Sequence, residues 1–130
     1  MEILVPIDGS ECSFHALDFA IEFARRFEAS LHVVHVSDSE TDATDEILAR
    51  ARERLAEEGV TDEPEVSTDV DLAFRPADRV GEDILALVEE RGYDHVVMGH
   101  HGSGAVDRMM LGSAAHTVIE EESVAVTIVP

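Results

Sequence analysis

The residues that could do chemistry in this chain gather in the segment MGHHGSGAVDRMMLGS, which runs from Met98 to Ser113. The segment holds glycines at 99, 102, 104 and 112, two adjacent histidines, and a Gly-Ser pair where a helix is expected to begin. Glycine permits positive φ and close approach of the backbone, and the free amides of a helix start carry partial positive charge. This combination is typical of a site for an anion such as phosphate.

Two common phosphate-binding patterns do not fit this segment. A Walker A loop requires a lysine, and the sequence contains none. The dinucleotide fingerprint G-x-G-x-x-G is broken by Asp107, which stands where the third glycine would be, and the segment follows the fourth expected strand instead of the first. What remains to be explained is the spacing of Gly99, Gly102, Gly112 and Ser113, with two residues in the first gap and nine in the second.

The rest of the chain supplies the elements that must position this segment. Hydrophobic and β-branched runs predict strands at 2–7, 30–36, 65–72, 94–99 and 124–129, and the charges along 65–72 suit an edge strand. Helical spacing predicts helices at about 13–27 after a cap at Ser10, from a cap at Thr41 or Thr44 to about 58, from Pro76 to Gly92, and at about 113–122. The residues expected on the inward faces of these helices are Leu17, Ala20, Ile21, Ala24, Phe27, Ile47, Leu48, Ala51, Leu55, Ala77, Val80, Ile84, Leu87, Val88, Ala115, Val118 and Ile119.

Strict alternation of strands and helices predicts an α/β fold. We expect one domain over residues 1–130, with a single doubly wound, five-stranded parallel sheet and helices on both faces. Right-handed crossovers favour the strand order 3-2-1-4-5, in which ligands bind beyond the carboxyl ends of the first and fourth strands. Residues 8–10 and 99–102 follow those two strands, so features far apart in the chain are predicted to meet at one place.

With these elements in place, the sequence resembles the universal stress protein family, and in particular its ATP-binding branch. That branch carries G-x2-G-x9-G-[ST] directly after a strand such as HVVM, and all four motif positions match here. ILVPIDGS at the start, LHVVHV at the second strand and the hydrophobic final strand extend the resemblance over nearly the whole chain. It implies a fold of the adenine nucleotide alpha hydrolase-like type.

The resemblance also implies a site for ATP or AMP. Pro6 and Val36 would lie against the adenine, Asp8 would hydrogen-bond the ribose hydroxyls, and the glycine motif would surround the phosphates. The whole implied set is Pro6, Asp8, Val36, Met98, Gly99, His101, Gly102, Gly112 and Ser113. Plainer alternatives stay open, in which Asp8 only starts a helix, Val36 belongs to the core and Arg108 is a solvated charge.

The sequence departs from the family pattern in its charges. Family members often place Arg or Lys after the second glycine, where this chain has Ser103, so triphosphate affinity is expected to be weaker unless Arg108 reaches the site. His100 stands where Ser is usual, beside the common His101. Backbone amides would supply positive potential without lysine, and Mg²⁺ with high salt would offset repulsion from the acidic surface.

Acidic residues dominate the composition. The chain has 29 Asp and Glu against nine Arg, and its formal net charge is -20. Such a surface repels itself at low salt and is screened at molar salt, so we expect a protein adapted to a salty cytoplasm. The acids are spread along the chain, which disfavours docking through an acidic tail, and the lack of clustered basic residues disfavours nucleic-acid binding.

Several other site types are disfavoured. The start MEILVPIDGS has no signal-peptide pattern, and no apolar run approaches the roughly 20 residues of a membrane helix, so a soluble cytoplasmic protein is expected. Cys12 has no partner for a disulfide and is interpreted as a small apolar helix residue. The histidines at 95, 100, 101 and 116 lack metal-ligand spacing, and SDSETDATDE lacks the central glycine of a calcium loop, so no metal site is predicted.

The interpretation that follows is a stress-response protein that binds ATP or AMP and acts as a nucleotide-dependent regulator. The resemblance implies a homodimer formed through the last strand, VAVTIVP, where Ala125 replaces the usual proline and leaves one more amide for pairing. One alternative is an enzyme with slow ATP hydrolysis or adenylyl transfer, although the sequence names no catalytic residue. Another is a nucleotide-free dimer that serves as a protein-interaction module. A receiver domain is disfavoured, because Asp8 is the lone acid after the first strand.

Overall fold

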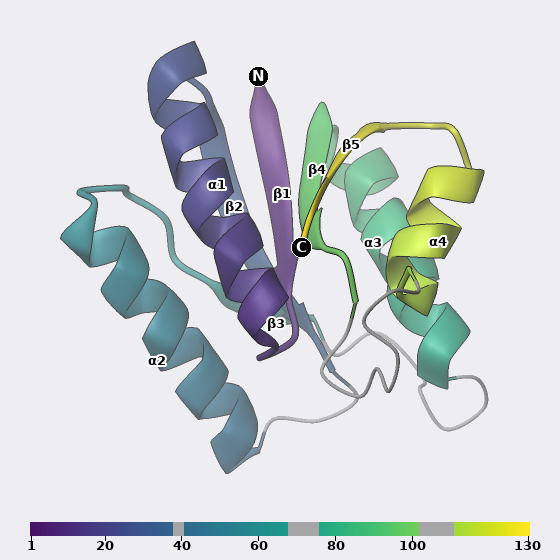
Figure 1. Ribbon diagram of the computed structural model, residues 1–130, viewed down its shortest axis with the longest axis horizontal. Coiled ribbons are helices and arrows are strands. Elements are labelled where there is room, and N and C mark those ends of the chain that lie inside the picture. The colour runs from purple at the N-terminus through teal and green to yellow at the C-terminus, as the bar shows by residue number, and fades with distance from the viewer. Residues whose placement is uncertain (38–40, 68–75, 102–110) are drawn as a thin grey trace.

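The sheet has the predicted strand order. The computed structural model describes residues 1–37, 41–67, 76–101 and 111–130. Five parallel strands lie in the order β3-β2-β1-β4-β5, which confirms the doubly wound topology (Figure 1). The strands are β1 (Glu2–Ile7), β2 (Ser30–Val36), β3 (Glu65–Ser67), β4 (His95–Gly99) and β5 (Ala125–Val129).

Two of the helices begin at side-chain caps that the sequence predicts. The helices are α1 (Glu11–Phe27), α2 (Asp42–Glu57), α3 (Pro76–Arg91) and α4 (Ser113–Glu120). The Ser10 hydroxyl accepts from the amide of Ser13, so α1 starts two residues earlier than expected. Thr41, one of the two expected caps, accepts from the amide of Thr44 at 3.3 Å and starts α2. Gly92, with φ of 73°, follows the end of α3.

Two hydrophobic cores lie on opposite faces of the sheet. Helices α1 and α2 cover one face, where Val5 of β1 and Phe14 of α1 are fully buried. Helices α3 and α4 cover the other face, where Leu4 of β1 and Val96 of β4 are fully buried (Figure 1). Burial of one such side chain contributes about 1.5–3 kcal/mol. Alternate residues of β1 and β4 therefore hold both helix layers against the strands whose carboxyl ends form the expected site.

Two of the inward residues predicted from helical spacing are exposed among the side chains that the structure describes, which do not include Ala77. Phe27 is 63% exposed at the last position of α1, where the helix runs past the amino ends of the strands, and it stacks on Phe23 with ring centroids 4.5 Å apart (Figure 1). Ile119 is 41% exposed, because Ala115 and Val118 already fill the inward side of the short α4. Helical spacing gives the direction of a side chain, and the length of the neighbouring sheet decides whether anything covers it.

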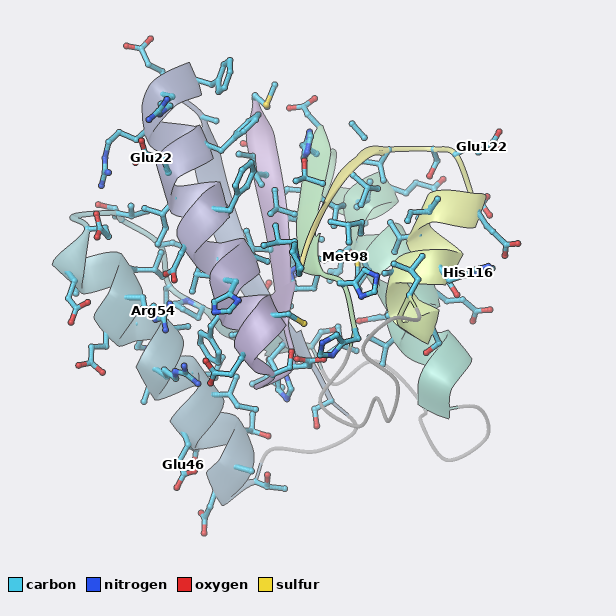
Figure 2. All side chains as sticks on the ribbon, in the orientation of Figure 1. Glu22, Glu46, Arg54, Met98, His116 and Glu122 are labelled. Atoms are coloured by element: carbon cyan, nitrogen blue, oxygen red, sulfur yellow. The ribbon has the colours of Figure 1, made fainter. Side chains whose placement is uncertain are left out.

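Many of the described acidic side chains lie on the outside of the molecule. Figure 2 shows Glu22, Glu46 and Glu122 pointing away from the sheet, and all three are exposed. Within the described ranges, no helix combines the length and the apolar character needed to cross a membrane. Residues 68–72 of the predicted third strand and 102–110 of the glycine segment lie outside the described residues, so the expectations for Gly102, Ser103 and Arg108 rest on the sequence.

Candidate functional site

The two segments predicted to meet are in contact beyond the carboxyl ends of β1 and β4. Residues 8–10 lead from β1 into α1, and His100 and His101 follow β4. The thiol of Cys12, in the first turn of α1, donates to the carbonyl oxygen of His101 at 2.8 Å. A contact between residues 89 positions apart therefore joins the two halves of the expected site.

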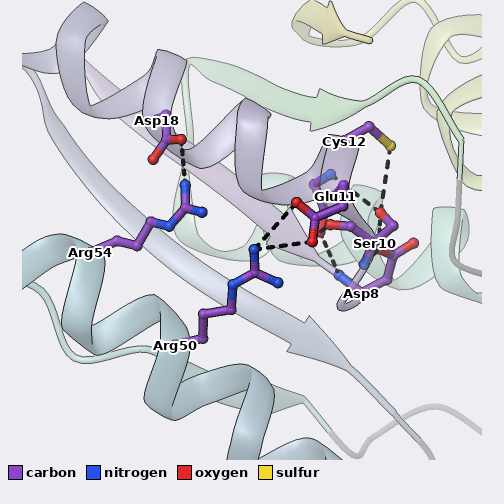
Figure 3. A network of polar contacts seen from close by, with 8 residues as sticks. Asp8, Ser10, Glu11, Cys12, Asp18, Arg50 and Arg54 are labelled. Carbon is purple, nitrogen blue, oxygen red and sulfur yellow. Dashed lines mark hydrogen bonds and ion pairs between the residues drawn. The ribbon is translucent and has the colours of Figure 1, made fainter.

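Asp8 organises the turn between β1 and α1. Its Oδ1 accepts hydrogen bonds from the Ser10 amide at 2.9 Å and the Ser10 hydroxyl at 2.5 Å (Figure 3). The Ser13 hydroxyl in turn donates to the Ser10 carbonyl at 2.8 Å. Asp8 is half-buried, and no described residue donates to its other oxygen, Oδ2. Asp8 therefore holds the N-cap residue Ser10 in place before α1, which is close to the plainer interpretation, and its Oδ2 accepts from no described residue.

The expected adenine side of the site lies on one face of the sheet. Pro6 is buried and alternates with Leu4, which places it on the face covered by α3 and α4. Val36 at the end of β2 is 9% exposed and Met98 near the end of β4 is 5% exposed, and both pack in the core on that face. These three residues come from three neighbouring strands, and Val36 and Met98 are also structural core residues.

His35 makes a contact that sequence reasoning missed. It was expected to be a sheet residue, and its Nδ1 lies 2.7 Å from the carbonyl oxygen of Ile7, its register partner on β1. Because a carbonyl oxygen only accepts, this nitrogen carries the proton. The ring therefore secures the end of β1 immediately before Asp8. The parallel pairing of the first two strands was the signal from which this contact could have been found.

The start of α4 has no side-chain cap from its own N-cap position. The N-cap is Gly112, and the first turn holds no acidic residue. The Gly112 amide donates to the His100 carbonyl at 2.7 Å, and the His100 amide donates to the Val129 carbonyl at 2.8 Å. Ser113 is exposed as the first helical residue. The positive end of the α4 dipole is thus held against the end of β4 with no carboxylate in its own first turn.

A second polar cluster lies near the β3 edge of the sheet, between β2 and β3. We call it the His32 cluster, and it consists of His32, Asp62, Glu65 and Arg91. His32 pairs with Asp62 through Nδ1 at 2.7 Å and with Glu65 through Nε2 at 2.8 Å. Asp62 also accepts from the Val33 amide at 3.0 Å, and Arg91 pairs with Glu65.

Hydrogen bonding sets the charges in the His32 cluster. The hydrogen bond to Asp62 raises the pKa of His32, burial opposes this, and the bond to Glu65 adds to it. The hydrogen bond from Arg91 lowers the pKa of Glu65. No sequence motif marks this cluster, since its members are spread over β2, β3, α3 and the loop before β3. In the part of the chain that the structure describes, no three His, Cys, Asp or Glu side chains form a group that could hold a metal ion.

Comparison with known proteins places the chain in a family. The model of the universal stress protein family matches residues 1–130. Universal stress protein YxiE of Bacillus subtilis is 29% identical, with 98% of this chain and 97% of that protein covered. A universal stress protein from Archaeoglobus fulgidus, solved in complex with dAMP, has a TM-score of 0.73 at 23% identity and covers 100% of this chain and 98% of that one. Another, solved in complex with cAMP, has a TM-score of 0.73 at 24% identity over 98% and 94% of the two chains. Since the family model matches from the first residue to the last, this chain belongs to the universal stress protein family.

Proposed function

We propose that the chain, as a single cytoplasmic domain, binds ATP or AMP beyond the carboxyl ends of β1 and β4 and acts as a nucleotide-dependent regulator in the stress response. The observation that carries the proposal is the position of the start of α4, which hydrogen bonds tie to the end of β4 close to the Asp8 turn and whose first turn holds no acidic residue. Two proteins of the same fold were solved with dAMP and cAMP, which supports an adenine nucleotide as the ligand.

Asp8 is the proposed ribose ligand. The two bonds from Ser10 occupy Oδ1 and hold the carboxylate in one orientation, so Oδ2 is ready to accept from a ribose hydroxyl. Hydrogen bonds to a charged group contribute about 1.5–3 kcal/mol. Pro6 and Val36 would then pack against the adenine, with Met98 beside them on the same face of the sheet.

The phosphates are proposed to lie at the start of α4. The amides of the first turn of α4 and the hydroxyl of Ser113 would face the phosphates, and Gly102 and His101 would complete the surroundings. The Gly112 amide already donates to the His100 carbonyl, so Gly112 would contribute by allowing close approach of the backbone. Because the net charge of the chain is -20, we expect Mg²⁺ and molar salt to be needed for full affinity for a triphosphate. This requirement would also be the direct sign of adaptation to a salty cytoplasm.

The decisive experiment identifies the bound nucleotide and then changes Asp8. The protein is purified in molar KCl with Mg²⁺, any released nucleotide is identified by chromatography, and the affinities for ATP and AMP are measured by calorimetry. Asp8→Asn keeps the acceptor for Ser10 but removes the charge, and we expect it to lower the affinity about tenfold or more.

The matched control is Asp94→Asn, the same change at the amino ends of the strands, where Asp94 accepts from the Glu2 amide at 2.8 Å. It should leave nucleotide affinity unchanged. A protein that carries no nucleotide and binds none on addition would overturn the proposal and favour the dimeric interaction module. Steady phosphate release from bound ATP would instead add slow hydrolysis to the function.

We also propose a homodimer that pairs through β5. This strand is an edge of the sheet, its residues from Val126 to Val129 are half-buried, and Ala125 at its start is exposed. An apolar edge strand with free amides pairs readily with a second copy of itself. Light scattering in molar KCl should give twice the mass of the chain, and a monomer at micromolar concentration would remove this part of the proposal.

A further inference from the structure

Gly99 has a structural task that the glycine motif does not reveal. A Cβ placed on Gly99 would lie 2.7 Å from the Sγ of Cys12, 3.0 Å from the Cys12 carbonyl carbon and 3.0 Å from the Ser13 nitrogen. Glycine at this position therefore lets the first turn of α1 pack directly on the end of β4. The first glycine of the motif serves contact between two elements, whatever it also offers to a ligand.

Cys12 is the side chain that uses this close approach. It is 3% exposed, and its Sγ reaches past Gly99 to the carbonyl oxygen of His101 at 2.8 Å. The Ser10 hydroxyl, which also donates to Asp8, lies 3.5 Å from the same sulfur. One thiol thus contacts both the backbone after β4 and the Asp8 turn, and Figure 3 shows its contact with Ser10.

The His101 carbonyl matters because its oxygen carries partial negative charge. An oxygen of this kind repels phosphate, and it lies two residues beyond the strand whose end leads to the proposed phosphate site. A donor that engages the oxygen holds the peptide group in one orientation and offsets part of its charge.

We propose that Cys12 is a positioning residue for the phosphate end of the nucleotide site, because its thiol holds the His101 carbonyl oxygen away from the bound phosphates. This inference rests on the proposed function. It predicts that a change of the side chain at position 12 lowers the affinity for ATP more than the affinity for AMP, since the repulsion grows with the number of phosphate charges. The adenine and ribose contacts, made by other residues, do not depend on the thiol.

The test compares Cys12→Ala, which removes the donor, with Cys12→Ser, which keeps one. Calorimetry with ATP and with AMP should show that Cys12→Ala weakens ATP binding about three- to tenfold, the range expected for one weak hydrogen bond, and AMP binding less than twofold. Cys12→Ser should restore ATP affinity to within about twofold of the unaltered protein, by the same estimate. Ala24→Gly, which weakens α1 near its other end, controls for loss of helix stability. It should change the affinities for ATP and AMP by the same factor.

A second readout uses the fact that Cys12 is the one cysteine in the sequence. Because the thiol is buried, its rate of alkylation in the folded protein reports how often the contact with His101 opens. Saturating ATP should slow alkylation more than saturating AMP does.

The outcomes separate the two proposals. If the unaltered protein binds neither nucleotide, the proposed function fails and this inference falls with it. If the protein binds ATP but Cys12→Ala binds it equally well, or if ATP leaves the alkylation rate unchanged, the nucleotide site stands and the role of Cys12 is refuted. Equal weakening of ATP and AMP binding by Cys12→Ala would also refute it, because the effect would then come from general destabilisation.

Discussion

The His32 cluster and the Asp8 turn are both polar and both lie beside strands. They differ in how many of their polar atoms have a hydrogen-bond partner within the protein. In the His32 cluster each nitrogen of His32 and each oxygen of Asp62 has a partner within the protein. At the Asp8 turn, Oδ2 of Asp8 has no donor among the described residues, and the nearby start of α4 has no side-chain cap. The difference teaches that the His32 cluster is satisfied within the protein, whereas the Asp8 turn keeps hydrogen-bonding capacity that the proposed ligand could use.

The energetic reason lies in the cost of leaving a polar group without a partner. A fully buried acceptor without a donor costs about 1–3 kcal/mol, and the described part of the chain contains no such side-chain atom, so Oδ2 of Asp8 lies within reach of water. Water at such an acceptor can be exchanged for a donor of a ligand, whereas the nitrogens of His32 and the oxygens of Asp62 are satisfied within the protein. On this argument the His32 cluster stabilises the fold, and the Asp8 turn keeps an acceptor for the proposed ligand.

The largest expected effect comes from Gly99→Ala, which should damage stability and site together. The new methyl group would meet backbone atoms of Cys12 and Ser13 as well as the thiol, so no side-chain rotation relieves it. We expect a loss of about 2–3 kcal/mol in the free energy of unfolding, measured with urea, together with weaker nucleotide binding.

Gly59→Ala is the matched control for this change. Gly59 has φ of 69° but nothing within reach of an added Cβ, so only backbone strain of about 1 kcal/mol is expected, without any change in nucleotide affinity. Equal effects of the two variants would contradict the close packing of α1 on β4.

Asp62→Ala should separate the two regions most cleanly. The change leaves Nδ1 of His32 and the amide of Val33 without their acceptor, and we expect a loss of about 2 kcal/mol in the free energy of unfolding. Nucleotide affinity should stay unchanged, the reverse of what is expected for Asp8→Asn. A clear loss of affinity in Asp62→Ala would show that the His32 cluster belongs to the site.

The smallest expected effect is a pH dependence of stability that the His32 cluster adds. The pKa of His32 is raised in the folded protein, so its stabilising contribution is complete below the ordinary value of about 6.5 and is lost as pH rises through the folded pKa. Urea unfolding at several pH values should show this decline on the alkaline side, and His32→Gln should remove it. Asp62, Glu65, Arg91 and the hydroxyl of Tyr93 are the titratable or charged groups that face this region.

His95 provides an internal contrast, because burial lowers its pKa. Protonation of this side chain is disfavoured in the folded protein, so its contribution to stability is lost as pH falls below about 6.5. The two histidines therefore act in separate pH ranges and with opposite signs. If the decline at alkaline pH persists in His32→Gln, the cluster is not its source.

The order and type of the elements could be predicted from sequence because each depends on local signals. Ser10 and Thr41 cap the helices that follow them, and the apolar run of β4 matches a strand buried on both faces. The exposure of Phe27 could not be predicted, because it depends on where α1 ends relative to the sheet. The contact of Cys12 with Gly99 could not be predicted either, since it depends on the distance between two elements.

The candidate site was only partly accessible to sequence reasoning. The glycine spacing and the resemblance to a family pointed to Asp8 and to the start of α4, and the strand order predicted that residues 8–10 and 99–102 would meet. The reserve acceptor on Asp8 depends on a side-chain orientation that no pattern encodes. The role of each residue toward a nucleotide stays a prediction until the binding experiments are made.

The pairing of β1 with its two neighbours has a consequence for the folding of the chain. Glu2 pairs with Ser30, 28 residues further along, whereas Ile3 pairs with His95, 92 residues further along. Closing the longer loop costs about 1 kcal/mol more in chain entropy, and contacts of such long range form slowly. During synthesis the β1–β2 pair can assemble while β4 is still unmade. A site located where β1 meets β4 therefore comes into existence only at the end of folding, so that a nucleotide would select chains in which that last step is complete.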